Sequence, residues 1–464
     1  MSRLRTRHLI APLAAAVLTG CSFMPTYERP AAPVPAAFPY PAAAEGTAAP
    51  ALDWQRFFAD ARLRELITTA LADNRDLRVA LLSIEQARAQ YDIRRADRLP
   101  TVGVGVNASR APSPSSGEQV SSFQAGLALT AWELDFFGRI ASLSEAALAQ
   151  YLATEEGRKA AQITLVGSIA TTWLSLVADE ELLALTRQTL ATREESLRLI
   201  QLRFDHGVSS ELDLRGAESL AETARAALAQ QQRQRALDLN ALGLLVGRAL
   251  PADFETGTTM AAIALPDVPA GLPSDLLAAR PDVRQAEQLL VAANANIGAA
   301  RAAFFPRITL TAQAGRASTQ LSGLFGGGGS WAYTVAPSLL LPIFDAGRNE
   351  AGLRTAQVGR DIAVAQYERA IQSAFREVSD ALAGRATLGE QLQAQSRVAQ
   401  AETVRTRLAQ MRFDAGVAST LDLLDAQRSL FTARQAEIQV RVAQLQNRVL
   451  LYRALGGGWS ETAP

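Results

Sequence analysis

The sequence predicts an internally duplicated α+β membrane protein in which each chain supplies four β-strands and several long helices. A stretch that begins at Arg203 recurs 209 residues later at Arg412, with 10 of 15 positions identical, which indicates two copies of one structural unit. Each copy combines stretches of alternating apolar and polar residues, typical of half-buried strands, with a proline-free run of 66 residues, typical of a long helix.

The composition argues against enzymes and nucleic-acid binders. The chain has 464 residues with 46 basic and 46 acidic side chains, so it lacks the positive excess that nucleic-acid binding normally requires. It contains two histidines and one cysteine, and no nucleophile–base pair or cluster of metal ligands stands out. We therefore expect no catalytic residue, no bound metal and no cofactor.

The first 20 residues have the pattern of a secretory signal peptide. An apolar run from Leu9 to Leu18 is too short to span a bilayer, and it follows positive charges at Arg3, Arg5 and Arg7. The next residues resemble the cleavage motif of bacterial lipoproteins, which implies that Cys21 becomes the lipid-bearing first residue of an outer-membrane protein. The alternatives are a chance cysteine behind an ordinary signal, or a buried thiol.

The duplication divides the rest of the chain into segments. Gly138–Arg139 and Gly347–Arg348 are separated by the same 209 residues as the longer repeat. Seven prolines between Ser22 and Leu52 favour an extended tether over a packed element. The predicted segments are a signal peptide (1–20), a lipidated tether (21–53), a first repeat (54–250), a connector (251–274), a second repeat (275–456) and a C-terminal tail (457–464).

Each repeat predicts the same order of elements. A helical segment precedes the alternating stretches, and a long helix and a last helix follow them. In the first repeat these three helices are expected at 60–98, 139–204 and 210–247. In the second repeat they are expected at 275–304, 348–413 and 419–455. A helix of 66 residues is roughly 100 Å long, so we expect such helices to pair lengthwise in a helical barrel. No 20-residue apolar stretch follows the signal, so strands would have to cross any membrane.

Four alternating stretches have the length of tilted transmembrane strands. They include residues 102–106, 123–130, 308–314 and 333–341, with Ser/Gly/Pro-rich loops at 107–121 and 318–330. Aromatic residues lie towards strand ends, as interfacial aromatics do, at Phe123, Trp132, Trp331 and Tyr333. A small soluble sheet would show the same alternation, but the lipoprotein motif and the long helices favour a membrane sheet. Since about eight strands are the fewest that close a barrel, several protomers must share one.

Longer motifs resemble the outer-membrane efflux protein family, or TolC family, in its lipoprotein branch. These motifs cover nearly the whole mature chain and include Asn74–Ala80, Ala131–Arg139, Tyr151–Glu155, Ala270–Leu277, Arg280–Asp282, Ala292–Pro306, Leu423–Phe431 and Gly456–Trp459. The resemblance implies a homotrimer whose 12-stranded outer-membrane β-barrel, with four strands per chain, continues into a long periplasmic α-helical barrel.

The resemblance also implies a passive exit duct of a tripartite pump that exports drugs and other small toxic compounds. Its partners would be a periplasmic adaptor protein, an inner-membrane transporter of the resistance–nodulation–division type, and outer-membrane lipid. Two alternatives stay open. The same duct could serve copper or silver ions, although only four methionines offer soft ligands, or the chain could be a periplasmic scaffold lipoprotein without a pore.

The resemblance places a periplasmic gate near the start of the last helix, at Leu421, Asp422, Asp425 and Arg428. Threefold symmetry would bring like carboxylates around a narrow axis, and ion pairs between helices could hold the tip shut. The first-repeat equivalents of Asp425 and Arg428 are Gly216 and Ser219, so only the second copy carries these charges.

Structural roles could explain the same residues. Ser419 and Asp422 have the spacing of a capping box, and Asp425 and Arg428 have the spacing of a solvated ion pair on one helix. The glycines that precede the last helices are predicted turn residues with left-handed backbone, at Gly207 and Gly416.

Overall fold

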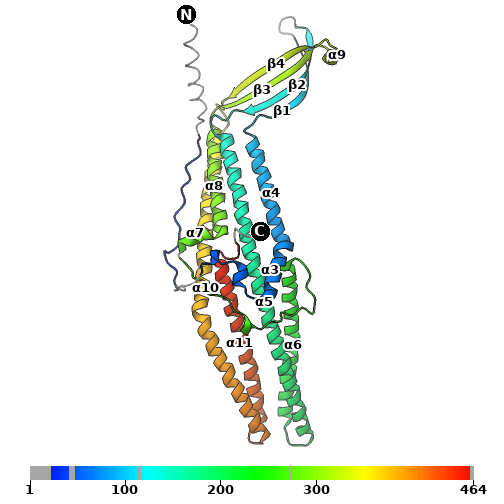
Figure 1. Cartoon of the computed structure of the whole chain (residues 1–464), viewed down its shortest axis with the longest axis vertical. Helices are drawn as coiled ribbons and strands as arrows, with labels where there is room; N and C mark the ends of the chain where they lie inside the picture. The colour runs from blue at the N-terminus through cyan, green and yellow to red at the C-terminus, as the bar shows by residue number, and fades with distance from the viewer. Residues whose placement is uncertain (1–21, 41–46, 113–116, 272, 460–464) are drawn as a thin grey trace. The chain divides into compact units, whose positions relative to one another are not determined.

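The computed structural model describes residues 22–40, 47–112, 117–271 and 273–459, so the predicted lipidation site Cys21 lies outside the described residues. Figure 1 shows the elements in chain order. The chain divides into two compact units. Within the described ranges, the first unit holds residues 22–31, 83–155 and 285–368, and the second holds residues 32–82, 156–284 and 369–459.

The first unit contains one antiparallel sheet with strand order β1-β2-β3-β4 (Figure 1). Its strands are β1 (Val102–Pro112), β2 (Gln119–Glu133), β3 (Arg307–Ser318) and β4 (Ser330–Leu340). The central pair, β2 and β3, joins the two repeats, with Gly126 opposite Gly315. Within the described part of the chain, β1 and β4 each pair on one side only, which leaves the backbone groups along both outer edges without strand partners.

The four predicted strands are confirmed, and their apolar side chains are largely uncovered. Val104 is 82% exposed, Trp331 73% and Val335 60%. Two expectations about the loops were wrong. The strands extend into both predicted loops, and the second loop contains a short helix, α9 (Leu321–Phe325), because the side chain of Leu324 is buried there. The sheet therefore exposes an apolar surface and two open edges.

The glycine pair at the centre of the sheet allows a close approach of two strands. A Cβ atom added to Gly126 would lie 2.2 Å from the carbonyl oxygen of Ala314, and one added to Gly315 would lie 2.1 Å from that of Ala125. Farther along β2, the register with β3 shifts between Leu129 and Trp132, and Ala131 there has a φ of 48°. Such a bulge increases the local twist, which a curved sheet requires.

The start of the described chain packs on the first unit, along α8 (Pro281–Ala302) and the residues that follow it. The ring of Phe23 stacks on that of Phe305, with centroids 4.3 Å apart. Farther along, Arg29 Nε donates to Glu287 Oε1 at 2.7 Å, and the Tyr27 hydroxyl donates to the same oxygen at 3.0 Å. The predicted extended segment is thus held by specific side-chain contacts.

Two helical hairpins form most of the second unit, and the longer helix of each hairpin begins in the first unit. The first consists of α5 (Arg139–Asp205) and α6 (Glu211–Val246), and the second of α10 (Arg348–Asp414) and α11 (Thr420–Ala454). The long helices predicted from the proline-free runs are confirmed. Trp173 and Leu176 on α5 are fully buried, which shows that α5 lies in the core of this unit.

The predicted first helix of each repeat is divided into two. Residues 60–98 form α3 (Ala61–Asp73) and α4 (Arg75–Ala96), and the chain turns between them at Asn74. The Asn74 side-chain oxygen accepts from the N–H of Leu77, and its amide donates to the carbonyl of Leu245, both at 2.9 Å. In the second repeat the break is at Pro281, which cannot continue a preceding helix. The remaining short helices are η1 (Ala49–Ala51), α2 (Trp54–Phe57), η2 (Met260–Ala262), η3 (Pro273–Asp275) and α7 (Leu276–Ala279).

Among the described helices, one contains a window apolar enough to cross a membrane. It is an 18-residue stretch within α5, and 56% of that stretch is buried inside the protein. Because α5 runs for 67 residues and its apolar side chains pack in the core, we interpret the window as a core segment.

We predict that Gly126→Ala prevents most of the protein from assembling into its oligomer. The new Cβ would collide with the backbone of β3, where no side-chain movement can relieve the contact. The measurement is the yield of oligomer from membranes by native gel electrophoresis. Gly103→Ala in β1 is the matched control, because a Cβ there meets nothing within 4 Å, and equal yields from the two variants would contradict the prediction.

Candidate functional site: the α10–α11 turn and its charge network

The turn between α10 and α11 is closed by backbone hydrogen bonds. Gly416 has a φ of 72°, and its N–H donates to the carbonyl of Phe413 at 3.0 Å, while the N–H of Val417 donates to that of Arg412 at 2.9 Å. The α5–α6 turn has the same geometry, with a φ of 74° at Gly207. This left-handed conformation favours glycine, since a Cβ would strain the backbone.

Asp422 takes part in a capping box at the start of α11. The Ser419 hydroxyl accepts from the backbone N–H of Asp422 at 3.2 Å, and Asp422 Oδ2 accepts from the backbone N–H of Ser419 at 3.1 Å. The Ser419 hydroxyl also donates to Asp422 Oδ2 at 2.8 Å, and these hydrogen bonds hold the pKa of Asp422 below its usual range. Ser210 and Asp213 form the same box in the first repeat, so these contacts account for Asp422 as a helix cap.

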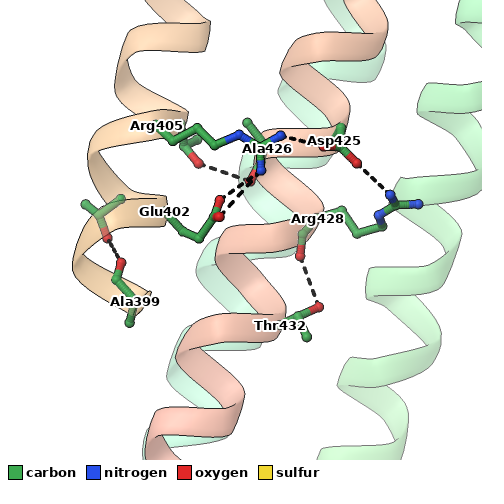
Figure 2. A network of polar contacts seen from close by, with 9 residues as sticks. Ala399, Glu402, Arg405, Asp425, Ala426, Arg428 and Thr432 are labelled. Atoms are coloured by element: carbon green, nitrogen blue, oxygen red, sulfur yellow. Dashed lines mark hydrogen bonds and ion pairs between the residues drawn. The ribbon is translucent and has the colours of Figure 1, made fainter. Parts of the chain in front are cut away.

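Asp425 lies at the centre of an ion-pair network that joins α10 to α11 (Figure 2). Its Oδ2 accepts from Arg405 Nη2 at 2.6 Å, and its Oδ1 accepts from Arg428 Nη2 at 2.5 Å. Arg405 also pairs with Glu402, at 3.1 Å. The hydrogen bond from Arg405, followed by that from Arg428, lowers the pKa of Asp425, so the carboxyl stays ionised near neutral pH.

The four predicted gate residues have different surroundings. Asp425 and Arg428 contact each other directly, Asp422 contacts Ser419, and Leu421 has a side chain that is 71% exposed. Leu421 therefore presents an apolar group to the outside of the single chain, where a neighbouring copy or the solvent would meet it.

Sequence reasoning missed Arg405 and Glu402, which complete the network. A signal for Arg405 was available, because Arg405 and Asp425 stand 11 and 9 residues from Gly416, and antiparallel helices bring together residues at similar distances from their turn. At the offset of the repeat, the first-copy equivalent of Arg405 is Ser196. The first hairpin therefore lacks all three charges of this arrangement.

The network lies beside the contact between the two hairpins. Leu424 of α11 packs in a buried apolar cluster with Ile200, Leu214 and Ala217 of the first hairpin. Gln427 donates from Nε2 to the hydroxyl of Ser196 on α5 at 3.2 Å. A movement of α11 away from α5 would thus expose this cluster, so apolar burial as well as the ion pairs stabilises the contact between the hairpins.

The chemistry of this site is electrostatic. In the ranges that the structure describes, no group of three or more histidine, cysteine, aspartate or glutamate side chains is arranged to hold a metal ion. The Asp425 network consists of ion pairs and contains no nucleophile in contact with a base. Such ion pairs can hold two helices together, or release them when the pairs break.

Another perturbed carboxyl lies on α5. Asp179 is buried, and burial together with the neighbouring carboxyl of Asp238 on α6 raises its pKa from 3.8 to about 7. Gln231 donates to Asp179 Oδ1 at 2.8 Å, and the positive charge of Arg235 acts in the opposite direction. Two carboxyls in contact cannot both ionise without repulsion, so Asp179 keeps a proton up to nearly neutral pH.

The antiparallel sheet with its two open edges and the paired helical hairpins define a class, namely a channel protein of the outer membrane. Family comparison gives the same result. The outer membrane efflux protein family matches residues 66–248 and 272–457, once for each repeat. The chain therefore belongs to the outer membrane efflux protein family, it is not an enzyme, and the resemblance stated from its motifs is confirmed.

Individual relatives match over almost their whole length. The probable efflux pump outer membrane protein TtgC of Pseudomonas putida is 47% identical, and the match covers 96% of this chain and 94% of that protein. The outer membrane protein OprJ of Pseudomonas aeruginosa is 46% identical, with 97% and 96% covered.

A solved structure shows the same fold. The open-state MtrE outer membrane channel of Neisseria gonorrhoeae has a TM-score of 0.86 and 40% identity, over 94% of this chain and 98% of that one. The four strands, the long helices and the two repeats are those of this channel family.

We predict that Asp179→Asn removes a pH-dependent loss of stability. Because the folded-state pKa of Asp179 is raised, its contribution to stability is fully present below pH 3.8 and is lost as the pH rises through about 7. Asparagine stays neutral, so the unfolding temperature of the variant relative to the wild type should be higher at pH 8 than at pH 5. Asp205→Asn, an exposed change at the end of α5, serves as control. A difference that is the same at both pH values for Asp179→Asn would contradict the prediction.

Proposed function

We propose that this protein is the passive exit duct of a tripartite efflux pump for organic solvents and antibiotics. The observation that carries the proposal is a sheet with two open edges in a chain of the outer membrane efflux family. Relatives at 47–48% identity are named as toluene, solvent and antibiotic efflux pump outer membrane proteins of Pseudomonas putida. These names favour organic compounds over copper or silver ions as the cargo.

The assembled duct is proposed to be a homotrimer. Open strand edges are not tolerated in lipid, because each unpaired backbone group there costs several kcal/mol. Pairing β1 of one chain with β4 of the next would satisfy both edges, and three chains would give 12 strands in a closed barrel. The exposed apolar side chains of the sheet would then face the hydrocarbon, and the helical hairpins would form the periplasmic tube.

We further propose a lipid anchor and two partner proteins for the duct. Cys21 would carry the lipid after removal of residues 1–20, and the contacts of Phe23, Tyr27 and Arg29 with the first unit would fix the start of the mature chain. A periplasmic adaptor protein and an inner-membrane transporter would supply coupling and energy.

The gate is proposed to be the α10–α11 turn. In a trimer, three copies of Asp425, Arg428 and Arg405 would surround the axis, and the two ion pairs of Asp425 would keep α11 against α10. Leu421 and Asp422 would complete the constriction, Leu421 through its exposed side chain and Asp422 through its charge next to the cap. If contacts with an adaptor replaced these ion pairs, the tube could open at the α10–α11 turn.

We expect Asp425→Ala to raise the single-channel conductance of the purified protein in a planar bilayer several-fold. The change breaks both ion pairs at once and leaves Arg405 and Arg428 with like charges facing each other. Arg405→Ala should raise conductance less, because the pair between Asp425 and Arg428 survives.

The first hairpin provides a matched control for this experiment. Arg225 of α6 pairs with Glu194 of α5 at 2.7 Å and with Glu222 of its own helix, which is the same arrangement with the charges reversed. Arg225→Ala should leave conductance unchanged. An equal change of conductance in Asp425→Ala and Arg225→Ala would contradict the assignment of the gate. An absence of conductance from the folded wild type would favour a scaffold protein without a pore.

A further inference from the structure

The two faces of the four-stranded sheet differ in chemistry. The register places cross-strand partners on a common face, because directly opposite residues of an antiparallel pair point the same way. One face is mainly apolar and includes Val104, Val106, Leu127, Trp331, Tyr333 and Val335. The other face carries glycines and polar side chains, among them Asn107 and Gln313.

The polar face is the concave one. Asn107 Nδ2 on β1 donates to Gln313 Oε1 on β3 at 3.0 Å, although β2 lies between these two strands. The register places this contact over Gly126 of β2, which has no side chain. A contact between alternate strands indicates that the sheet curves towards the polar face, so the apolar face would be the outside of a closed barrel.

Two arginines interrupt the apolar face, and both lie where a strand leads into a loop. Arg110 is two residues from the end of β1, and Arg316 is two residues from the end of β3. The opposite ends of these strands connect to helices. Arg110 shares its face with Val106 of the same strand, whereas Arg316 stands opposite Trp331 of β4, and both arginine side chains are exposed. The loop end of the apolar face therefore carries two positive charges.

Neither guanidinium forms an ion pair with a carboxylate among the described residues. Arg316 Nη2 donates to the carbonyl of Gly329 at 2.9 Å, which directs the side chain towards the β3–β4 loop and leaves further N–H donors over. Glu133, the acidic residue within the four strands, lies at the helix end of β2, where it pairs with Arg307 at 2.7 Å. The two charges at the loop end can thus be balanced by an anion from outside the chain.

The position of these charges suits the surface of a membrane. An arginine on the lipid face of a barrel is unfavourable near the bilayer centre and is tolerated close to the interface. Trp331 and Tyr333, which lie beside Arg316, are 73% and 74% exposed, as aromatic residues at that interface are. Arginine binds phosphate through paired N–H donors, and lipid phosphates lie at the same level of the bilayer.

We propose that Arg110 and Arg316 each bind the phosphate of an anionic lipid in the outer leaflet of the outer membrane. The acyl chains of this lipid lie against the convex apolar face, and the guanidinium groups hold its phosphates at the loop end. Opposite charges thus meet where the apolar surfaces of protein and lipid also match. The inference rests on the proposed duct, because it requires the sheet to lie in the outer membrane with its loops outside.

Lipid binding by the purified full-length oligomer tests this inference. The probe is lipid A, a glycolipid with two phosphate groups, which is titrated into the detergent-solubilised protein and counted as bound adducts by native mass spectrometry. The double variant Arg110→Gln/Arg316→Gln should bind it about fivefold or more weakly than the wild type, because one arginine near an anionic membrane surface contributes about that factor. Both side chains are exposed, so the variant should form the oligomer in normal yield.

Two controls separate phosphate recognition from general attraction. Arg233→Gln removes a positive charge from an exposed position on α6 and should bind lipid A as the wild type does. Digalactosyl diacylglycerol, which has sugars and acyl chains but no phosphate, should bind weakly and equally to the wild type and the double variant. Equal binding of lipid A by the wild type and the double variant would overturn the inference, as would equal binding of the two lipids by the wild type.

Failure of the proposed function would give a different result. A wild type that forms neither an oligomer nor a conducting pore would contradict the duct itself. A conducting oligomer that does not distinguish the two lipids would contradict only the lipid sites.

Discussion

The open edges of the four-stranded sheet are the constraint on which the rest of the structure depends. The N–H and C=O groups on the outer sides of β1 and β4 have no strand partners within the described chain, and the face of the sheet is apolar. In lipid such edges must be paired, and a sheet of four strands cannot curl far enough to pair with itself. A single chain therefore leaves its sheet incomplete, and the proposed tube and gate would form only when copies assemble.

Duplication explains how one chain builds two similar hairpins, and divergence explains why the charges of the proposed gate lie in only one of them. The two hairpins share their turn geometry and their capping boxes, which set the helix ends in both copies. Only the second copy carries Arg405, Asp425 and Arg428, whereas the first has Ser196, Gly216 and Ser219 at these positions. In the proposed duct, the first hairpin would contribute a wall and the second would contribute the charges that can be exchanged. The contact between the hairpins contains the apolar cluster around Leu424 and the hydrogen bond from Gln427 to Ser196.

Features that depend on local sequence could be predicted, and features that depend on tertiary contacts could not. The proline-free runs, the strand alternation and the glycine turns have periodicities and residue types that are visible in one dimension. The break at Asn74 depends on a hydrogen bond to Leu245, 171 residues away, and the residues next to Asn74 do not indicate this break. Likewise α9 forms in a glycine-rich loop of weak helix propensity, because burial of the Leu324 side chain stabilises it.

The candidate site divides in the same way. Asp422 and Asp425 could be named from the repeat and its motif, but their different partners could not. Asp422 is engaged by Ser419, three residues away, whereas Asp425 pairs across the hairpin with Arg405, 20 residues away. The buried position of Arg193 on α5 was not predicted at all, because it depends on the packing of α6 and α11, where its guanidinium donates to the carbonyl of Leu220 and lies 5.2 Å from the ring centre of Phe431.

We propose that the chain completes its sheet only by sharing a barrel with two copies of itself. Native mass spectrometry of the folded protein released from detergent micelles tests this directly, because it counts the subunits in each particle. We expect a mass of three chains and no stable folded particle of lower mass. A stable folded particle of one, two or four chains would contradict the proposal.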